Sequence, residues 1–135
     1  MDLQRFVDAQ DPVFDQVCAE LRAGAKRSHW MWFVFPQLRM LGHSSTARFY
    51  GIEDRAEALA YWQHPLLGPR LKQCAELVLG VRGRTVNEIF GSPDDLKLCS
   101  SMTLFEAVAP EEAVFAEVLD RFYQGSRDKA TLRAI

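Results

Sequence analysis

The sequence predicts an all-α fold: a single compact domain over residues 1–135, built from seven or eight short helices with no substantial sheet. Helix-capping residues, prolines and glycines recur along the chain at the spacing of helix starts and stops. The apolar residues between them repeat at helical intervals. The chain has 135 residues, of which 48% are hydrophobic and 25% charged, the size and composition of one globular domain.

The first helices are indicated by apolar spacing and by their end signals. Residues 3–7 fit a short amphipathic turn or two. Asp11 followed by Pro12 is typical of an N-cap and the first helical position. The apolar residues that follow keep helical spacing until Gly24, so we expect this helix to end there.

The aromatic segment at residues 30–35 fits two structures. Its length and aromatic content favour a buried strand. A strand needs a partner, however, and no other segment of the sequence has the pattern of one. We therefore expect a short buried helix that is capped by Ser28 and ends near Pro36.

The middle of the chain carries clear helix signals. Residues 44–50 fit a short helix, and Asp54 is placed to cap another helix that stops before Pro65. Residues 66–79 place their apolar side chains on one stripe, which predicts a longer amphipathic helix. Residues 81–84 are expected to form a loop.

Two capping motifs are expected in the next segment. Thr85 and Glu88 have the spacing of a capping box for a short helix that Gly91 closes. Ser92 and Asp95 match the broader form of the same motif, with a proline at the first helical position. The helix after this second box is expected to begin at that proline.

The C-terminal part predicts one amphipathic helix and a last turn. Pro110 is expected to start the helix, because proline suits the first helical position. The apolar residues of this helix face inward until Gly125 ends it. Residues 132–135 fit a final helical turn.

The charges are nearly balanced in sum but not along the chain. There are 16 basic and 18 acidic residues, a net charge of −2. This balance argues against bulk nucleic-acid binding, since domains with that function usually carry a basic excess. Residues 22–48 hold five basic residues and no acid, whereas residues 106–120 hold five acids and no base. Head-to-tail self-association between these two regions therefore stays open.

The sequence carries no signal for a membrane, a metal or a cofactor. Its first residues lack a signal-peptide pattern, and its longest apolar run is far shorter than a bilayer span. The three cysteines are odd in number and widely spaced, which favours buried thiols in a reducing compartment. The histidines lack metal-ligand spacing. We expect a soluble cytoplasmic protein without metal or cofactor.

The first candidate site is the basic and aromatic segment Lys-Arg-Ser-His-Trp-Met-Trp. A helix that starts at Ser28 would present unpaired amide N–H groups to an anion, directly after Lys26 and Arg27. Trp30 and Trp32 would supply a stacking wall for a base or sugar. The alternative is that the tryptophans are core and the basic pair lies in a solvated loop. The predicted ligand-binding residues here are Lys26, Arg27, Ser28, Trp30, Trp32 and Gln37.

The second candidate site is the segment at residues 92–105. Its predicted helix carries four polar donors among apolar residues: Lys97, Ser100, Ser101 and Thr103. Polar residues in such numbers are unfavourable by helix propensity. They either satisfy a buried network or face a ligand, and we include all four among the predicted ligand-binding residues.

Two residues are candidates for acid–base catalysis. Histidine side chains exchange protons near neutral pH, so His29 is a candidate acid or base. Asp95, in the second candidate segment, is the other. The alternative for His29 is a hydrogen-bonded core residue. The sequence leaves open whether any reaction is catalysed.

Several motifs together resemble a known family. The run Gly-Ala-Lys-Arg-Ser-His-Trp-Met-Trp-Phe-Val-Phe-Pro-Gln begins at Gly24, and Leu-Gly-His-Ser follows at Leu41. Further matches lie within residues 3–10, 64–71, 89–105 and 128–132. The chain thus resembles domain-of-unknown-function family 1810, a mainly bacterial family in which some members carry the misleading label calpastatin. The resemblance implies a small single-domain helical protein and no particular activity.

The motifs of this resemblance coincide with the two candidate segments, which favours one shared pocket. We expect the pocket to bind a small anionic ligand such as a nucleotide, an ADP-ribose-like molecule or a sugar phosphate, with enzymatic turnover left open. The alternative function is a non-catalytic protein-interaction module whose aromatic motif is core.

Overall fold

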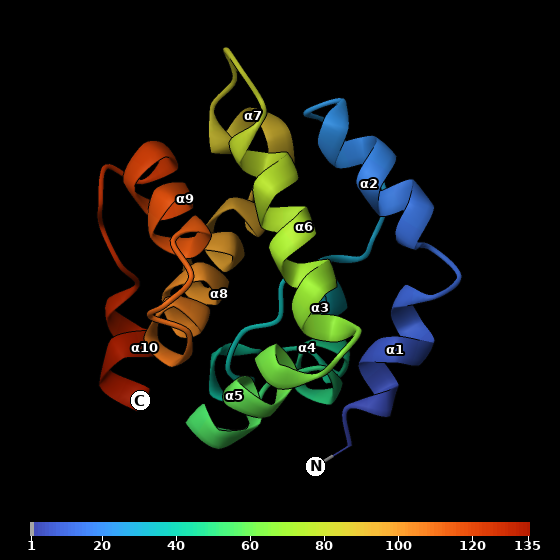
Figure 1. Ribbon diagram of the computed structural model, residues 1–135, viewed down its shortest axis with the longest axis vertical. Coiled ribbons are helices and arrows are strands. Elements are labelled where there is room, and N and C mark those ends of the chain that lie inside the picture. The colour runs from blue at the N-terminus through green and yellow to red at the C-terminus, as the bar shows by residue number, and fades with distance from the viewer. Residues whose placement is uncertain (1) are drawn as a thin grey trace.

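The computed structural model describes residues 2–135, and this range is all-α as predicted (Figure 1). It holds ten α-helices, one 3₁₀ turn and no strand; an isolated parallel bridge joins Leu38 and Ile52. The helices are α1 (Gln4–Gln10), α2 (Phe14–Arg22), α3 (Met31–Val34), α4 (Ser45–Phe49), α5 (Arg55–Gln63), α6 (Leu67–Leu79), α7 (Val86–Phe90), α8 (Asp94–Val108), α9 (Val114–Phe122) and α10 (Lys129–Ala134), with the 3₁₀ turn η1 at Arg39–Leu41.

Helix α8 is the buried centre around which the other helices pack. It contacts α5, α7, α9 and α10 (Figure 1). Leu98, Met102 and Phe105 lie along one face of α8 and Leu104 on another, and all four are completely buried. Every residue from Ser100 to Phe105 is buried, so neighbouring elements cover this stretch of α8 on every side. Large apolar side chains on more than one face of a helix need such cover, which accounts for the central place of α8.

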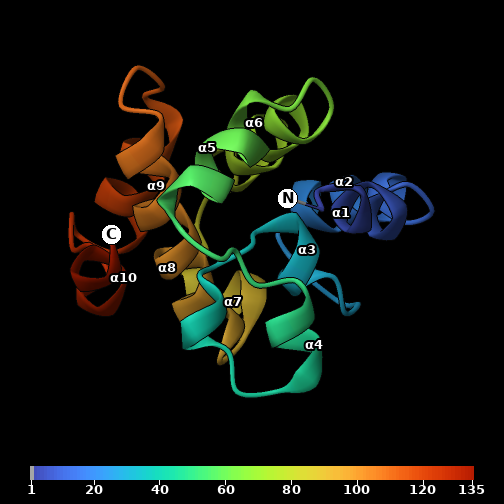
Figure 2. The same ribbon diagram turned by 90° about the horizontal axis from the view of Figure 1, so that it is seen from below.

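Helix α6 packs against α2, α5 and α9, and so connects helices from the N-terminal, middle and C-terminal parts of the chain. The tight turn from α5 into α6 depends on Gly68, since a Cβ atom there would collide with the backbone carbonyl oxygen of Trp62. His64 caps the turn, because its Nδ1 accepts hydrogen bonds from the amides of Leu66 (3.1 Å) and Leu67 (3.2 Å). In Figure 2, α3, α4 and α7 lie below α5 and α6.

Most of the predicted helix ends are confirmed. Ser44 caps α4 and Asp54 caps α5, each by accepting a hydrogen bond from an amide three residues later. Both halves of the capping box between Thr85 and Glu88 are formed at the start of α7. Gly24 has a positive φ of 67°, the left-handed backbone that favours glycine where a helix ends.

The predicted start of α2 at Asp11 and Pro12 is wrong. Asp11 has helical dihedral angles and is the C-cap of α1, and α2 begins at Phe14 without a side-chain cap. The carboxylate of Asp11 instead forms an ion pair with Arg70 of α6 at 2.9 Å. A distant cation has therefore taken the side chain that the local pattern assigned to a helix cap.

Two further helix starts are displaced for a similar reason. The box between Ser92 and Asp95 does not form, because the carboxylate of Asp95 accepts from the side-chain amide of Asn87 (3.2 Å). Helix α9 begins at Val114 rather than at Pro110. Glu112 accepts from the Val114 amide (3.4 Å) and pairs with Lys72 of α6 (3.0 Å), so contacts outside the helix set its start.

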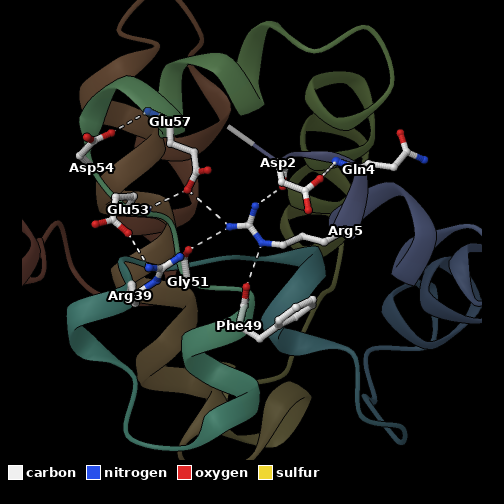
Figure 3. A network of polar contacts seen from close by, with 9 residues as sticks. All are labelled: Asp2, Gln4, Arg5, Arg39, Phe49, Gly51, Glu53, Asp54 and Glu57. Carbon is white, nitrogen blue, oxygen red and sulfur yellow. Dashed lines mark hydrogen bonds and ion pairs between the residues drawn. The ribbon is translucent and has the colours of Figure 1, made fainter.

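Arg5 holds α1 against the segment between α4 and α5 (Figure 3). Its guanidinium donates hydrogen bonds to the carbonyl oxygens of Phe49 (2.9 Å) and Gly51 (3.1 Å). It also pairs with Glu57 at 3.5 Å, and the two side chains are only 9% and 7% exposed. Glu57 accepts from the amide of Glu53 (2.8 Å) as well. This buried pair thereby fixes three chain segments to one another.

Replacing Arg5 by methionine should strongly destabilise the fold. The variant keeps an apolar stem but leaves the Glu57 carboxylate buried without its cation, which costs about 3 kcal/mol in the free energy of unfolding. Urea unfolding followed by circular dichroism measures this loss. The control is Arg82→Met in the exposed loop after α6, which should change stability by less than about 0.5 kcal/mol. Equal losses of unfolding free energy in the two variants would show that Arg5 does not hold α1 against the segment between α4 and α5.

Candidate functional site

The segment before α3 is organised by a buried carboxylate, that of Glu20. This side chain accepts hydrogen bonds from the amides of Arg27 (2.8 Å) and Ser28 (3.1 Å) and from the Ser28 hydroxyl (2.6 Å). It also accepts from the indole Nε1 of Trp30 at 2.9 Å. Glu20 is 4% exposed. One carboxylate from α2 therefore fixes the backbone and side chains of the whole segment.

The predicted helix start at Ser28 is wrong, and with it the predicted anion site on free amides. Helix α3 begins at Met31, with Trp30 at its N-cap position. The amides of Arg27 and Ser28 instead donate to the Glu20 carboxylate of the chain itself. An external anion finds these donors already occupied.

The hydrogen bonds to Glu20 control its ionisation. Burial by itself raises the pKa of this carboxyl, but the bonds from Ser28, Arg27, Gln16 and Trp30 outweigh burial and lower the pKa to about 2. The Glu20 carboxyl is therefore ionised at neutral pH, and its oxygens accept the hydrogen bonds of these donors.

Trp30 is part of the core rather than of an open wall. It is 1% exposed and packs near Phe35 and Phe90. The ammonium group of Lys26 lies 5.0 Å from the centre of its ring. The alternative given above for the tryptophans, that they are core, holds for Trp30. Trp32 differs, because it is half-buried and faces a cavity.

A cavity of about 400 Å³ brings the two predicted segments together, and we name it the cationic cavity. It lies between the segment before α3, the end of α7 and the first turn of α8. Five predicted site residues line it: Lys26, Arg27, His29, Trp32 and Lys97. Arg27 and His29 are exposed at its rim. Residues of the two candidate segments thus line one cavity.

The charges in the cationic cavity are three cations against one carboxylate, that of Asp94. Asp94 pairs with Lys26 at 2.9 Å and with Lys97 at 3.8 Å. Lys26 is only 7% exposed and also donates to the carbonyl oxygen of Ser28 (2.7 Å). The ammonium group of Lys97 lies 5.5 Å from the ring centre of Trp32. The excess of positive charge is therefore carried by Arg27 and Lys97.

A second cavity of about 540 Å³ lies on the other side of Lys97, and we name it the apolar cavity. Its walls come from η1, α4, α8, α10 and the residue after α9. The apolar side chains lining it are Leu41, Ala47, Pro93, Leu96 and Ala130. Its polar lining residues include Gln37, His43, Lys97, Ser100, Tyr123 and Asp128. Because Lys97 and Pro93 line both cavities, the two are adjacent.

Five of the predicted site residues do not line either cavity: Ser28, Trp30, Asp95, Ser101 and Thr103. The Thr103 hydroxyl donates to the carbonyl oxygen of Cys99 (2.8 Å) and accepts from the Asp128 amide (3.0 Å), so it ties α8 to α10. Ser101 is completely buried, and its hydroxyl has no partner among the described residues. Asp95 faces α7 through Asn87.

The lining residues that were not predicted as site residues include Asp94, His43, Tyr123 and Asp128. The sequence held a signal for Asp94, since it stands three positions before Lys97 and such residues are neighbours on a helix. His43, Tyr123 and Asp128 come from separate segments that only the packing around α8 brings together. His43 and Asp128 stand in motifs of the family resemblance, but no local pattern assigned any of the three residues to a cavity.

The family model described as a protein of unknown function, DUF1810, matches the chain over residues 1–135. The chain belongs to this family. It is also similar to a solved structure, that of the conserved hypothetical protein Rv1873 from Mycobacterium tuberculosis, with 57% identity and a TM-score of 0.96. That match covers 98% of this chain and 94% of the other. No curated protein matches the chain. The family resemblance expected from the motifs is confirmed.

Within residues 2–135, no helix is both long and apolar enough to cross a bilayer. Nor do any three histidine, cysteine or acidic side chains in that range gather as they would to hold a metal ion.

Replacing Glu20 by glutamine should flatten the acid dependence of stability. A carboxyl whose pKa is lowered by folding stabilises the protein above its unfolded pKa, and this contribution is lost as the pH falls toward the folded pKa of about 2. Between about pH 5 and pH 2 the wild type should lose about 2 kcal/mol more unfolding free energy than Glu20→Gln. Urea titrations at several pH values measure the difference.

The matched control is Glu117→Gln, which changes an exposed carboxyl on α9. This variant should keep the acid dependence of the wild type. The role assigned to Glu20 is wrong if both variants lose stability with falling pH as steeply as the wild type does.

Proposed function

We propose that the cationic cavity binds a small anionic molecule through a phosphate group, such as a nucleotide, an ADP-ribose-like molecule or a sugar phosphate. One observation carries the proposal: Arg27, His29 and Lys97 converge on one cavity from distant segments beside the ring of Trp32. Cations beside an aromatic ring suit a phosphate attached to a sugar or base.

The cations of the cavity have different roles. Lys26 is nearly buried and already bound to Asp94 and to the Ser28 carbonyl, so it positions Asp94 rather than meeting a ligand. Arg27 is exposed, and its guanidinium can grip a phosphate with two parallel hydrogen bonds. Lys97 is 24% exposed and supplies a second charge from the opposite wall.

His29 is the residue to which we assign any proton transfer at this site. It lines the cationic cavity and is exposed at its rim. We do not assign this role to Asp95, the other expected acid or base, because its carboxylate bonds to Asn87 of α7 and it lines neither cavity. The function that we propose is ligand binding. Turnover by His29 is the activity to assay with any ligand that binds.

An interaction module is the second candidate function, and one observation favours it. The most distinctive aromatic residue, Trp30, is core, so part of the motif serves the fold alone. Self-association through the acidic region has less support. Glu106 and Asp120 both pair with Arg127, and Glu112 pairs with Lys72, so three of the five acids there have cations within the chain.

We also infer a cytoplasmic location from the state of the thiols. All three cysteines are free, and Cys18 and Cys74 are buried. Burial raises the pKa of both thiols, which keeps them protonated and unreactive. Free buried thiols suit a reducing compartment such as the cytoplasm.

Removing either exposed cation should weaken ligand binding without unfolding the protein. In isothermal titration calorimetry with ribose 5-phosphate and with AMP, Arg27→Ala and Lys97→Ala should each weaken binding about tenfold, since a charge-assisted hydrogen bond contributes about 1.5–3 kcal/mol. Added salt should weaken wild-type binding further. Arg82→Ala, which removes an exposed arginine outside the cavity, should bind as the wild type does.

The interaction-module function gains if neither compound binds the wild type. Equal affinities of the wild type, Arg27→Ala and Lys97→Ala would contradict the proposed site even if a phosphate compound does bind.

A further inference from the structure

We infer, resting on the function proposed above, that the apolar cavity holds the uncharged ring of the same ligand. The class of molecule that the two cavities bind together is then a nucleoside phosphate. The phosphate lies in the cationic cavity and the base in the apolar cavity, with Lys97 between them.

The walls of the apolar cavity suit a flat ring. Its apolar lining comes from α4, α8 and α10, and its volume of about 540 Å³ is in the range of small-ligand sites. Tyr123 adds an aromatic ring. The Tyr123 hydroxyl donates to the carbonyl oxygen of Asp95, so this ring is held in place at the cavity wall. A preformed ring gives a base a stacking surface at little entropic cost.

Polar groups at the same cavity can orient the ring. Asp128 caps α10 with one carboxylate oxygen, Oδ2, which accepts from the amide and the hydroxyl of Thr131. Its other oxygen, Oδ1, takes no part in these bonds and can accept from the amino group of a base. The side-chain amide of Gln37 lines the cavity as well and can both donate and accept.

Lys97 makes the two cavities one site. It lines the cationic cavity, the apolar cavity and a narrow crevice between them, which Trp32 and Gln37 also line. A ligand that occupies both cavities passes its ammonium group, where a phosphate next to a sugar would be neutralised. A free phosphate would leave the apolar cavity without a ligand group. A purely apolar ligand would leave Arg27 and Lys97 without an anion.

Nuclear magnetic resonance with fragments of a nucleotide tests this division. The probes for the labelled full-length protein are ribose 5-phosphate, adenosine and the four common nucleoside 5′-monophosphates. Ribose 5-phosphate should shift the amides of residues 26–32 and the Trp32 indole. Adenosine should shift those of residues 41–44 and 128–131, and the nucleotides should shift both sets. At least one nucleotide should bind about tenfold or more tightly than ribose 5-phosphate, given the usual energy of base stacking.

Filling the apolar cavity provides a variant test. Ala130→Trp places a large side chain in this cavity, whereas Ala134→Trp adds the same side chain at an exposed position of the same helix. Ala130→Trp should reduce nucleotide affinity to that of ribose 5-phosphate and leave ribose 5-phosphate binding unchanged. Ala134→Trp should leave both affinities unchanged.

The outcomes separate the two proposals. Ribose 5-phosphate binding, with no nucleotide binding more tightly and no shifts at residues 41–44, would overturn the nucleoside assignment and leave the phosphate site intact. Undiminished nucleotide affinity in a folded Ala130→Trp protein would overturn it too. If neither ribose 5-phosphate nor any nucleotide binds, the phosphate site itself is wrong and the nucleoside assignment fails with it.

Discussion

The burial of α8 is the constraint on which the rest of the structure depends. Its residues from Ser100 to Phe105 are all buried, so neighbouring helices cover this stretch on every side. Its first turn extends beyond this core and carries Asp94 and Lys97. These charged residues therefore stand on the end of a rigid helix, and both cavities form where other segments meet that end. The centre of the core and the candidate site are two parts of one helix.

Contacts between charged and polar groups of the chain itself position most of the remaining segments. Glu20 acts on the segment before α3 as an external anion would, since it occupies two amides, a hydroxyl and an indole. The basic character of this region is thus partly structural. Residues 22–48 hold five basic residues, but only one of them is left to meet a ligand in the cationic cavity. This residue is Arg27, which is exposed and also lines the cavity.

The sequence predicted the fold well wherever the deciding contacts were local. The caps at Ser44, Asp54 and Thr85 involve residues three positions apart, so their spacing alone identifies them. Helix starts were missed where a distant partner took the side chain, as Arg70 does with Asp11 and Asn87 with Asp95.

The candidate site divides in the same way. The sequence could pick out Lys26, Arg27 and His29 as a group because they are consecutive or nearly so, and all three line the cationic cavity. The residues of the apolar cavity, such as Tyr123 and Asp128, come together only through packing.

The contacts of Arg5 with the segment between α4 and α5 have a consequence for the order in which the helices pack. Its acceptors at Gly51 and Glu57 lie 46 and 52 residues further along the chain. As the protein emerges from the ribosome, the guanidinium of Arg5 on α1 therefore lacks these acceptors until residues 51 and 57 have been synthesised. Docking of the N-terminal helix closes a long loop and waits for α5, although α1 is made first.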